Sequence, residues 1–260
     1  MRLKDRVAIV TGGGRGIGKA ISQAFVSEGA IVVIAARTSS KLEETVEKIK
    51  SQGGRAKGIQ TDVSDEKQVQ RMVAETLNEY GKVDILVNNS GIGGPTASVV
   101  DLKLEDWNEV IATNLTGSML CAREVLKHMI PHKRGNIINI GSDAGRFGYF
   151  MRSPYCVSKW GIIGLTETLA IEAGLYNIRV NCISPAAVRG ERLINVVMGR
   201  SKATGVPFEE LMSKITANYA LQRPTEEAEV AAAAVFLASD ESSAITGHTL
   251  VVNCGHYIVQ

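Results

Sequence analysis

The chain has 260 residues, of which 45% are hydrophobic and 22% are charged, and its formal net charge is +2 at pH 7. These values are ordinary for a globular enzyme, the length suffices for a large core, and the small net charge argues against a nucleic-acid partner. The longest apolar run, Val230 to Ala238, is too short to cross a bilayer, so we expect no membrane contact.

The first half of the chain alternates apolar strands with amphipathic helices. The first strand covers residues 7–10 and leads into a glycine cluster, after which apolar residues recur at helical spacing. Strands are then expected at residues 30–36, 56–60 and 83–87. Between them, one helix is predicted to begin with Ser40 as its N-cap, and another opens at residues 64–67.

The second half continues the same alternation. Helices are predicted at residues 107–129, 154–173 and 226–239, and strands at residues 136–140, 178–183 and 249–252. Strands that are apolar throughout and alternate with helices indicate a parallel sheet covered on both faces. We therefore predict one doubly wound α/β domain of the Rossmann type, spanning residues 1–260, with about seven strands.

One long segment, residues 187–225, interrupts this rhythm. Two short helices are predicted inside it, near residues 193–198 and 208–219. Long insertions in compact domains commonly serve as lids or binding segments, and this one leaves the sheet at the carboxyl end of a strand. We expect it to cover the substrate.

The glycine cluster after the first strand is predicted to bind phosphate, because free backbone N–H groups and the helix dipole point the same way. The phosphate loop of NTPases requires Ser or Thr after Gly18-Lys19, but Ala20 stands there, so the Mg²⁺ ligand is missing. The common dinucleotide pattern also fails, because Ile17 replaces its third glycine. What remains is the spacing Gly12-x-x-x-Gly16-x-Gly18.

A tyrosine and a lysine four residues apart, Tyr155 and Lys159, share one face of a predicted helix. A neighbouring ammonium favours the phenolate and lowers the pKa of the phenol, so the pair could exchange a proton with a carbonyl or an alcohol. Ser142 follows a strand at the same sheet edge, where its hydroxyl could bind a reacting carbonyl or simply cap a turn. The four histidines show no metal-ligand spacing, so no metal site is expected.

These motifs, together with Asp62-Val63, Asn88-Asn89-Ser90-Gly91 and Asn114, occur in the order seen in short-chain dehydrogenases/reductases. The chain resembles this family from Leu3 to Gly255, and most of all its 3-oxoacyl-acyl-carrier-protein reductase group. The resemblance implies hydride transfer between a nicotinamide cofactor and a carbonyl or secondary alcohol.

The resemblance also implies a role for each matching residue. Tyr155 would be the general acid and base, Lys159 would lower its pKa and hold the nicotinamide ribose, and Ser142 would orient the substrate oxygen. Asn114 would bind a water in a proton relay, and Asp62 and Val63 would flank the adenine. The complete expected cofactor site is Gly12, Arg15, Gly16, Ile17, Gly18, Arg37, Thr38, Asp62, Val63, Asn89, Gly91, Tyr155, Lys159 and Val188.

Charge at the end of the second strand predicts which cofactor binds. An NAD site needs an acidic residue there, whereas this chain has Ala36-Arg37-Thr38. Arg37 and Arg15 could both reach a 2′-phosphate, so NADP(H) is expected over NAD(H). Two other interpretations stay open, namely an NAD-dependent alcohol or hydroxy-acid dehydrogenase of the same family, and a non-catalytic NADP-binding sensor.

Several segments bear on the substrate and on assembly. Five arginines border the expected pocket, so an anionic substrate is one hypothesis, and the alternative is that these arginines are ordinary surface residues. An apolar wall of the pocket is expected from residues 147–151. Two stretches depart from the family pattern, namely residues 184–189 and the tail Asn253-Cys254-Gly255-His256. The resemblance implies a homotetramer, and four scattered cysteines without a C-x-x-C motif favour reduced thiols in the cytoplasm. The arginines that border the expected pocket are Arg146, Arg152, Arg189, Arg192 and Arg200.

Overall fold

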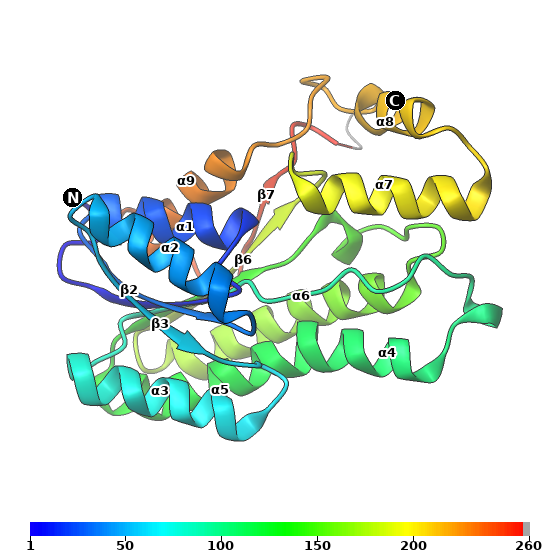
Figure 1. Ribbon diagram of the computed structural model, residues 1–260. Coiled ribbons are helices and arrows are strands. Elements are labelled where there is room, and N and C mark those ends of the chain that lie inside the picture. Colours follow the sequence, from blue (N-terminus) through cyan, green and yellow to red (C-terminus); the bar gives the residue numbers. More distant parts are fainter. Residues whose placement is uncertain (257–260) are drawn as a thin grey trace.

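The computed structural model describes residues 1–256 and shows alternating strands and helices along the chain (Figure 1). The strands are β1 (Val7–Thr11), β2 (Ile31–Ala36), β3 (Arg55–Gln60), β4 (Ile85–Asn88), β5 (Gly135–Ile140), β6 (Ile178–Pro185) and β7 (Thr249–Val252). The α-helices are α1 (Gly16–Ser27), α2 (Ser39–Ser51), α3 (Glu66–Tyr80), α4 (Leu104–Ile111), α5 (Gly117–His132), α6 (Ser153–Gly174), α7 (Glu191–Thr204), α8 (Phe208–Ala217) and α9 (Glu227–Ala238).

Within the described residues the strands form one seven-stranded parallel sheet in the order β3-β2-β1-β4-β5-β6-β7. The chain runs outward in one direction from β1 to β3 and in the other from β4 to β7. The two halves therefore diverge between β1 and β4. In such sheets, ligands bind outside the carboxyl ends of the strands at this switch point.

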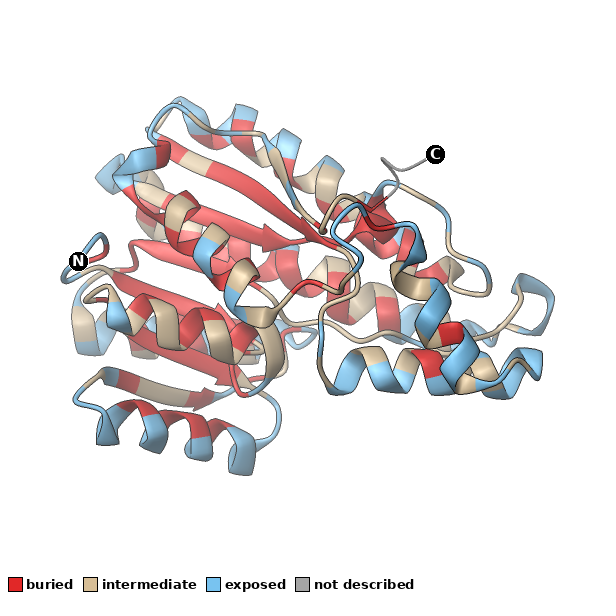
Figure 2. Ribbon diagram, turned by 90° about the horizontal axis from the view of Figure 1, so that it is seen from above, coloured by how far each residue is buried: buried red, intermediate tan, exposed pale blue. Residues whose placement is uncertain are grey.

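Helices cover both faces of the sheet, as the apolar strands predict. Helices α1, α2 and α9 pack on one face around a core that includes Ile21, Phe25 and Val235. Helices α3, α5 and α6 pack on the other face, where Met72, Val125 and other apolar side chains are buried. Figure 2 shows the strands as the most buried part of the molecule. The predicted doubly wound α/β fold is confirmed.

The helix predicted at residues 107–129 is wrong as a single element. Helix α4 begins earlier, at Leu104, and a five-residue π-helical turn, Ala112–Thr116, separates it from α5. Such wide turns recur at functional sites because they redirect side chains. Here the turn contains Asn114, which is fully buried.

Two further expectations about local structure need correction. Ser40 is not the N-cap of α2, because the helix begins at Ser39 and Thr38 is the cap residue, without a capping hydrogen bond from its side chain. The first inserted helix is also longer than expected, since α7 covers Glu191–Thr204 and extends at both ends beyond the predicted six residues, whereas α8 begins at Phe208 as predicted and ends two residues early. Polar residues that could cap a helix occur at many turns, so the first and last residues of a helix are hard to predict from the sequence.

Helices α7 and α8 lie apart from both helix layers, beyond the carboxyl ends of β6 and the neighbouring strands (Figure 1). They pack mainly on each other and on the loops at that edge. Among residues 1–256, no helix combines the length and the hydropathy that a membrane-spanning segment requires.

Candidate active site

A cleft of about 1090 Å³ opens at the carboxyl edge of the sheet, between the strand ends and helix α7. Two expected site residues do not line it: Gly18, which lies beneath the glycine turn, and Asn114, which is buried behind the wall. The expected residues that line it are Gly12, Arg15, Gly16, Ile17, Arg37, Thr38, Asp62, Val63, Asn89, Gly91, Ser142, Tyr155, Lys159 and Val188.

The glycine turn packs against the loop after β4 too closely for side chains at Gly12 and Gly18. Gly12 has a φ of +65°, and a Cβ there would lie 2.9 Å from Asn89 Nδ2. A Cβ at Gly18 would lie only 2.4 Å from the same nitrogen. The Asn89 amide donates to the carbonyl oxygens of Thr11 and Gly12, at 2.9 and 3.1 Å, and so fixes the turn. A bare backbone cradle at a helix N-terminus fits a pyrophosphate.

Tyr155 and Lys159 lie one turn apart on α6 and both face the cleft. Lys159 Nζ lies 5.8 Å from the centroid of the Tyr155 ring and donates to the carbonyl oxygen of Ile140 at 2.7 Å. Ile140 is the last residue of β5, so this bond holds the ammonium at the sheet edge. The Ser142 hydroxyl is hydrogen-bonded to Tyr155 and accepts from the N–H of Ala144 at 3.2 Å.

The surroundings of these two groups change their pKa values. Burial raises the pKa of Tyr155, but the charges of Lys159 and Arg192 and the Ser142 hydrogen bond lower it, and the net pKa lies below its ordinary value. Burial also lowers the pKa of Lys159, which the neighbouring Tyr155 partly opposes. The phenol is thereby moved toward the range in which a group exchanges protons near neutral pH.

Asn114 acts on this site from behind the cleft wall. Its Oδ1 accepts from the N–H of Ile92 at 2.8 Å, and its Nδ2 donates to the Ile92 carbonyl and to Ser158 Oγ, both at 3.0 Å. The loop that follows β4 is therefore joined to the helix that carries Tyr155. The proton relay expected at Asn114 stays a prediction.

The other end of the cleft is rich in charged side chains. Arg37 follows β2 and lies 3.9 Å from Asp62, while Arg15 in the glycine turn lies 3.4 Å from Glu191 at the start of α7. The cleft wall here also includes Thr38. The guanidinium groups of Arg15 and Arg37 are more than half exposed, so an incoming anion can reach both.

Only some of the arginines expected to border the site line the end of the cleft that contains Tyr155. Arg152, Arg189, Arg192 and Arg200 line the cleft, whereas Arg146 does not. The expected apolar wall is likewise reduced to Tyr149 and Phe150, because Phe147 and Met151 lie outside the cleft. Of these arginines, Arg152 and Arg192 act on Tyr155 directly, since the charge of each lowers the pKa of its phenol. Their positions near Tyr155 depend on the paths of two loops, so the spacing of residues in the sequence does not predict them.

The two segments that depart from the family pattern both reach the site. Residues 185–188 line the cleft despite their unusual sequence. In the tail, Asn253 Nδ2 donates to Asp143 Oδ2 at 2.8 Å, and His256 Nδ1 lies 2.9 Å from the same oxygen. Asp143 is fully buried and directly follows Ser142. The tail thus supports the turn that presents the serine hydroxyl.

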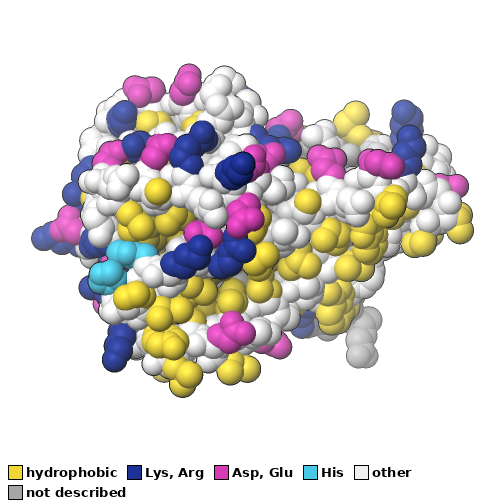
Figure 3. Space-filling model, turned by 90° about the horizontal axis from the view of Figure 1, so that it is seen from below, with side chains coloured by type: hydrophobic (Ala, Val, Ile, Leu, Met, Phe, Trp, Pro, Cys, Tyr) yellow, Lys and Arg dark blue, Asp and Glu magenta, His cyan; other side chains and the backbone are white. Residues whose placement is uncertain are grey.

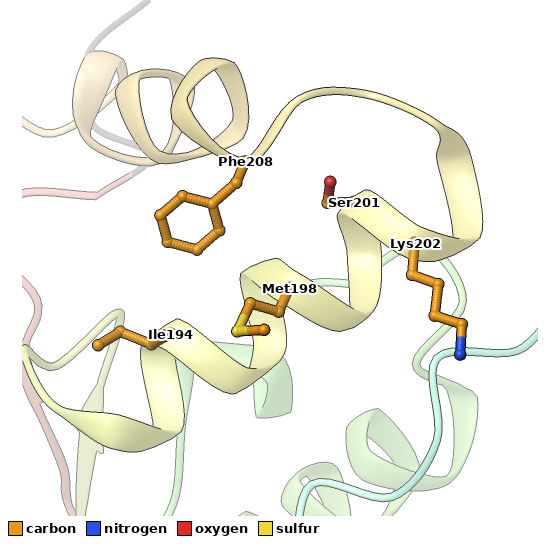
Figure 4. Close-up of a pocket in the computed structure, with 5 residues that line it drawn as sticks. All are labelled: Ile194, Met198, Ser201, Lys202 and Phe208. Carbon is orange, nitrogen blue, oxygen red and sulfur yellow. The ribbon is translucent and has the colours of Figure 1, made fainter.

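A second, smaller hollow of about 430 Å³ lies between α7 and α8 (Figure 4). Ile194, Met198 and Phe208 point toward it, and Ser201 and Lys202 border it. Helix α7 therefore borders the main cleft on one face and this apolar hollow on another. Residues 1–256 contain no cluster of three or more His, Cys, Asp or Glu side chains that could hold a metal ion.

Known proteins resemble this chain in sequence and fold over most of their length. A family model described as short chain dehydrogenase matches residues 6–199. Glucose 1-dehydrogenase 2 of Bacillus subtilis is 38% identical over 255 residues, which cover 97% of this chain and 95% of that protein.

Two solved structures show the same relationship. An actinorhodin polyketide ketoreductase with NADPH is 33% identical, with a TM-score of 0.93 over 97% of this chain and 98% of that one. An NAD⁺-bound xylitol dehydrogenase is 30% identical, with a TM-score of 0.94 over 97% and 99%. The chain therefore belongs to the short-chain dehydrogenase/reductase family, whose members are oxidoreductases that act on alcohols and ketones with a nicotinamide cofactor.

Proposed function

We propose that this protein is an NADP(H)-dependent oxidoreductase that interconverts a ketone and a secondary alcohol, with Tyr155 as the general acid and base. The observation that carries this proposal is the convergence of Tyr155, Lys159 and Ser142 in one cleft with the glycine turn. A nicotinamide cofactor bound in this cleft supplies a hydride to the carbonyl carbon in reduction and accepts one in oxidation.

The chain's own residues would handle the proton and the orientation of the substrate. Ser142 hydrogen-bonds the substrate oxygen, and the Tyr155 hydroxyl gives its proton to that oxygen in reduction or takes it back in oxidation. Lys159 keeps the phenol acidic through its charge. Asn114 holds the loop at Ile92 against α6 through two hydrogen bonds with Ile92 and one with Ser158.

The residues around the cleft suit a dinucleotide. Gly12, Gly16 and Ile17 would hold the pyrophosphate, while Asp62 and Val63 would flank the adenine. Asn89, Gly91 and Val188 line the middle of the cleft, between the glycine turn and Tyr155. A Cβ at Gly91 would lie 3.1 Å from Asn114 Oδ1, so a larger residue would crowd this wall.

The variant Tyr155→Phe tests the catalytic role, because it removes the proton donor and keeps the ring. We expect kcat to fall by about 100-fold or more, since general acid catalysis typically contributes that much. The dissociation constant for the cofactor, measured by fluorescence titration, should stay within about twofold. Unchanged turnover would instead favour a cofactor-binding sensor and reject the enzymatic mechanism.

The preference for NADP(H) is supported by Arg15, Arg37 and Thr38, and by the lack of a carboxylate directly after β2. A 2′-phosphate can draw Arg37 from its 3.9 Å contact with Asp62, which costs little at an exposed site. We expect kcat/KM for NADPH to exceed that for NADH by about tenfold or more, and Arg37→Asp to reverse the order. A preference of the unmodified enzyme for NADH would contradict this assignment.

We also propose that the protein works as a homotetramer in the cytoplasm. Hydrophobic side chains gather on the face that carries α4, α5 and α6 (Figure 3). They include Val157, Trp160 and Ile171, which are 46%, 54% and 78% exposed. All four cysteines are free thiols, which agrees with a reducing compartment.

A further inference from the structure

Two guanidinium groups flank the proposed catalytic tyrosine. Arg152 directly precedes α6, and its Cζ lies 5.3 Å from the centroid of the Tyr155 ring. Arg192, in the first turn of α7, donates a hydrogen bond to the carbonyl oxygen of Gly91. Both side chains line the cleft. The cleft therefore carries two positive charges next to the group that exchanges the proton.

Neither guanidinium charge is neutralised by a carboxylate of the described residues. Among residues 1–256, no carboxylate lies within 4.0 Å of Arg152 or Arg192. By contrast Arg189, in the same inserted segment as Arg192, lies 2.8 Å from Glu226. Burial, and to a smaller degree the charge of Arg192, lower the pKa of Arg152. Arg152 is half-buried whereas Arg192 is exposed, and a second like charge near a half-buried guanidinium costs free energy, which an anionic ligand would offset.

Arg192 is well prepared to bind such a ligand. A guanidinium has five N–H donors in a rigid fork, and the Gly91 carbonyl takes up only part of that capacity. The contact with Gly91 fixes the direction of the fork, so less entropy is lost when an anion binds. The remaining donors suit the two or three oxygens of a carboxylate, sulfonate or phosphate.

We propose that the substrate carries an anionic oxygen group that Arg152 and Arg192 bind beside Tyr155, which makes it a short oxo acid or the matching hydroxy acid. This inference rests on the proposed function, because it assigns the carbonyl end of the same molecule to Tyr155. Since Arg152 stacks against the ring itself, the anionic group lies within a few bonds of the reacting carbon.

The phosphates of the cofactor have a different set of partners. The glycine turn presents backbone without side chains at Gly12, Gly14 and Gly16 to the cleft, and Arg15 and Arg37 lie at that end. Arg152 instead lies against the tyrosine at the other end. The test must nevertheless separate the two ligands, because α7 also contacts the glycine turn through Glu191 and Arg15.

The experiment compares matched pairs of acid and methyl ester, with pyruvate, acetoacetate and 4-oxopentanoate as the acids. We expect kcat/KM for the best acid to exceed that for its ester by about tenfold or more. Arg152→Gln and Arg192→Gln should each reduce this ratio at least tenfold, while Arg152→Lys should recover part of it. The NADPH dissociation constant should stay within about twofold in all three.

Arg146→Gln is the matched control. It removes the same charge from the same loop, but Arg146 is exposed, lies 5.4 Å above the Phe147 ring and does not line the cleft. Its ratio of acid to ester should equal that of the unmodified enzyme. An unchanged ratio in Arg152→Gln would overturn the proposal. An unchanged ratio in Arg192→Gln together with weaker NADPH binding would show that Arg192 binds the cofactor and not the substrate, contrary to the proposal.

A binding measurement covers the case in which no tested acid is turned over. Calorimetric titration of the enzyme with NADPH present uses isobutyrate, propane-1-sulfonate and propyl phosphate, with methyl isobutyrate as the neutral probe. The proposal requires that at least one anion binds, that the ester binds at least tenfold more weakly, and that Arg152→Gln abolishes the difference. Binding of no anion would overturn it. Tyr155-dependent turnover of the esters without any preference for acids would also overturn it, yet leave the proposed function intact.

Discussion

Tyr155 and Lys159 show how two buried groups change each other's acidity. Burial alone would raise the pKa of the phenol, but the ammonium and nearby guanidinium charges outweigh it, and the net pKa is lowered. The ammonium keeps its position because it donates to the Ile140 carbonyl at 2.7 Å. The residue that tunes the proton donor is thus fixed by the sheet.

Alcohol oxidation should therefore depend on pH in a defined direction. Oxidation needs the phenolate of Tyr155, so kcat/KM should rise with pH through the lowered pKa and then level off. Lys159→Met removes the charge that lowers this pKa, so the midpoint should move to higher pH and the rate should drop by about 100-fold. Initial rates between pH 6 and 11 measure both effects. A midpoint that does not move in the variant would disprove the role of Lys159.

Some site residues follow from local sequence and others do not. The four-residue spacing of Tyr155 and Lys159 needs only a helix to place them on one face. Arg146 and Arg152 look alike in sequence, yet only Arg152 lines the cleft, because the loop path before α6 separates them. Helix periodicity cannot predict such a path.

At the scale of elements, the strands were predictable because most are rich in buried apolar residues and bounded by turn residues, although β3 contains Arg55, Lys57 and Gln60. The break between α4 and α5 was not, since a π-helical turn adds one residue per turn without changing the apolar pattern appreciably. Its effect is large, because it turns Asn114 toward Ile92 and Ser158. The contacts that hold the turn at Ser142 in place involve the tail, which lies more than 100 residues away in the sequence, so local patterns do not predict them.

Asp143 connects three of these elements, and its removal should be costly. Its carboxylate accepts hydrogen bonds from Ser184 Oγ at 3.2 Å and from Asn253, and His256 lies beside it. Asp143→Ala leaves these buried donors without their partner, so we expect unfolding to become easier by about 1–3 kcal/mol. Urea denaturation followed by circular dichroism measures this.

Asp240→Ala serves as the comparison, because Asp240 pairs with Arg6 at an exposed site and its removal should cost much less. Equal stability of the two variants would show that the Asp143 contacts contribute little. The Asp143→Ala variant should also lose activity, since the turn that presents Ser142 loses its support.

At the scale of the whole molecule, the face formed by α4, α5 and α6 leaves hydrophobic side chains uncovered in the isolated chain (Figure 3). Trp160 lies near the middle of α6 and is 54% exposed. Trp160→Glu would place a charge inside the proposed interface, so we expect the tetramer to dissociate at micromolar concentrations. Sedimentation velocity measures the mass of the particles in solution.

Leu221→Glu is the control for this variant. Leu221 is 59% exposed but lies in the inserted segment, away from α6, so its replacement should leave the mass unchanged. A monomeric unmodified protein, or a Trp160→Glu variant of unchanged mass, would contradict the proposed assembly.

Helix α7 crosses the mouth of the cleft and is held there at two points. Glu191 pairs with Arg15 of the glycine turn, and Arg192 donates to the Gly91 carbonyl. A dinucleotide held by the glycine turn and the strand ends, as proposed, would lie beneath these contacts. Both contacts lie at exposed positions, so we expect entry of the cofactor to require only a small movement of α7.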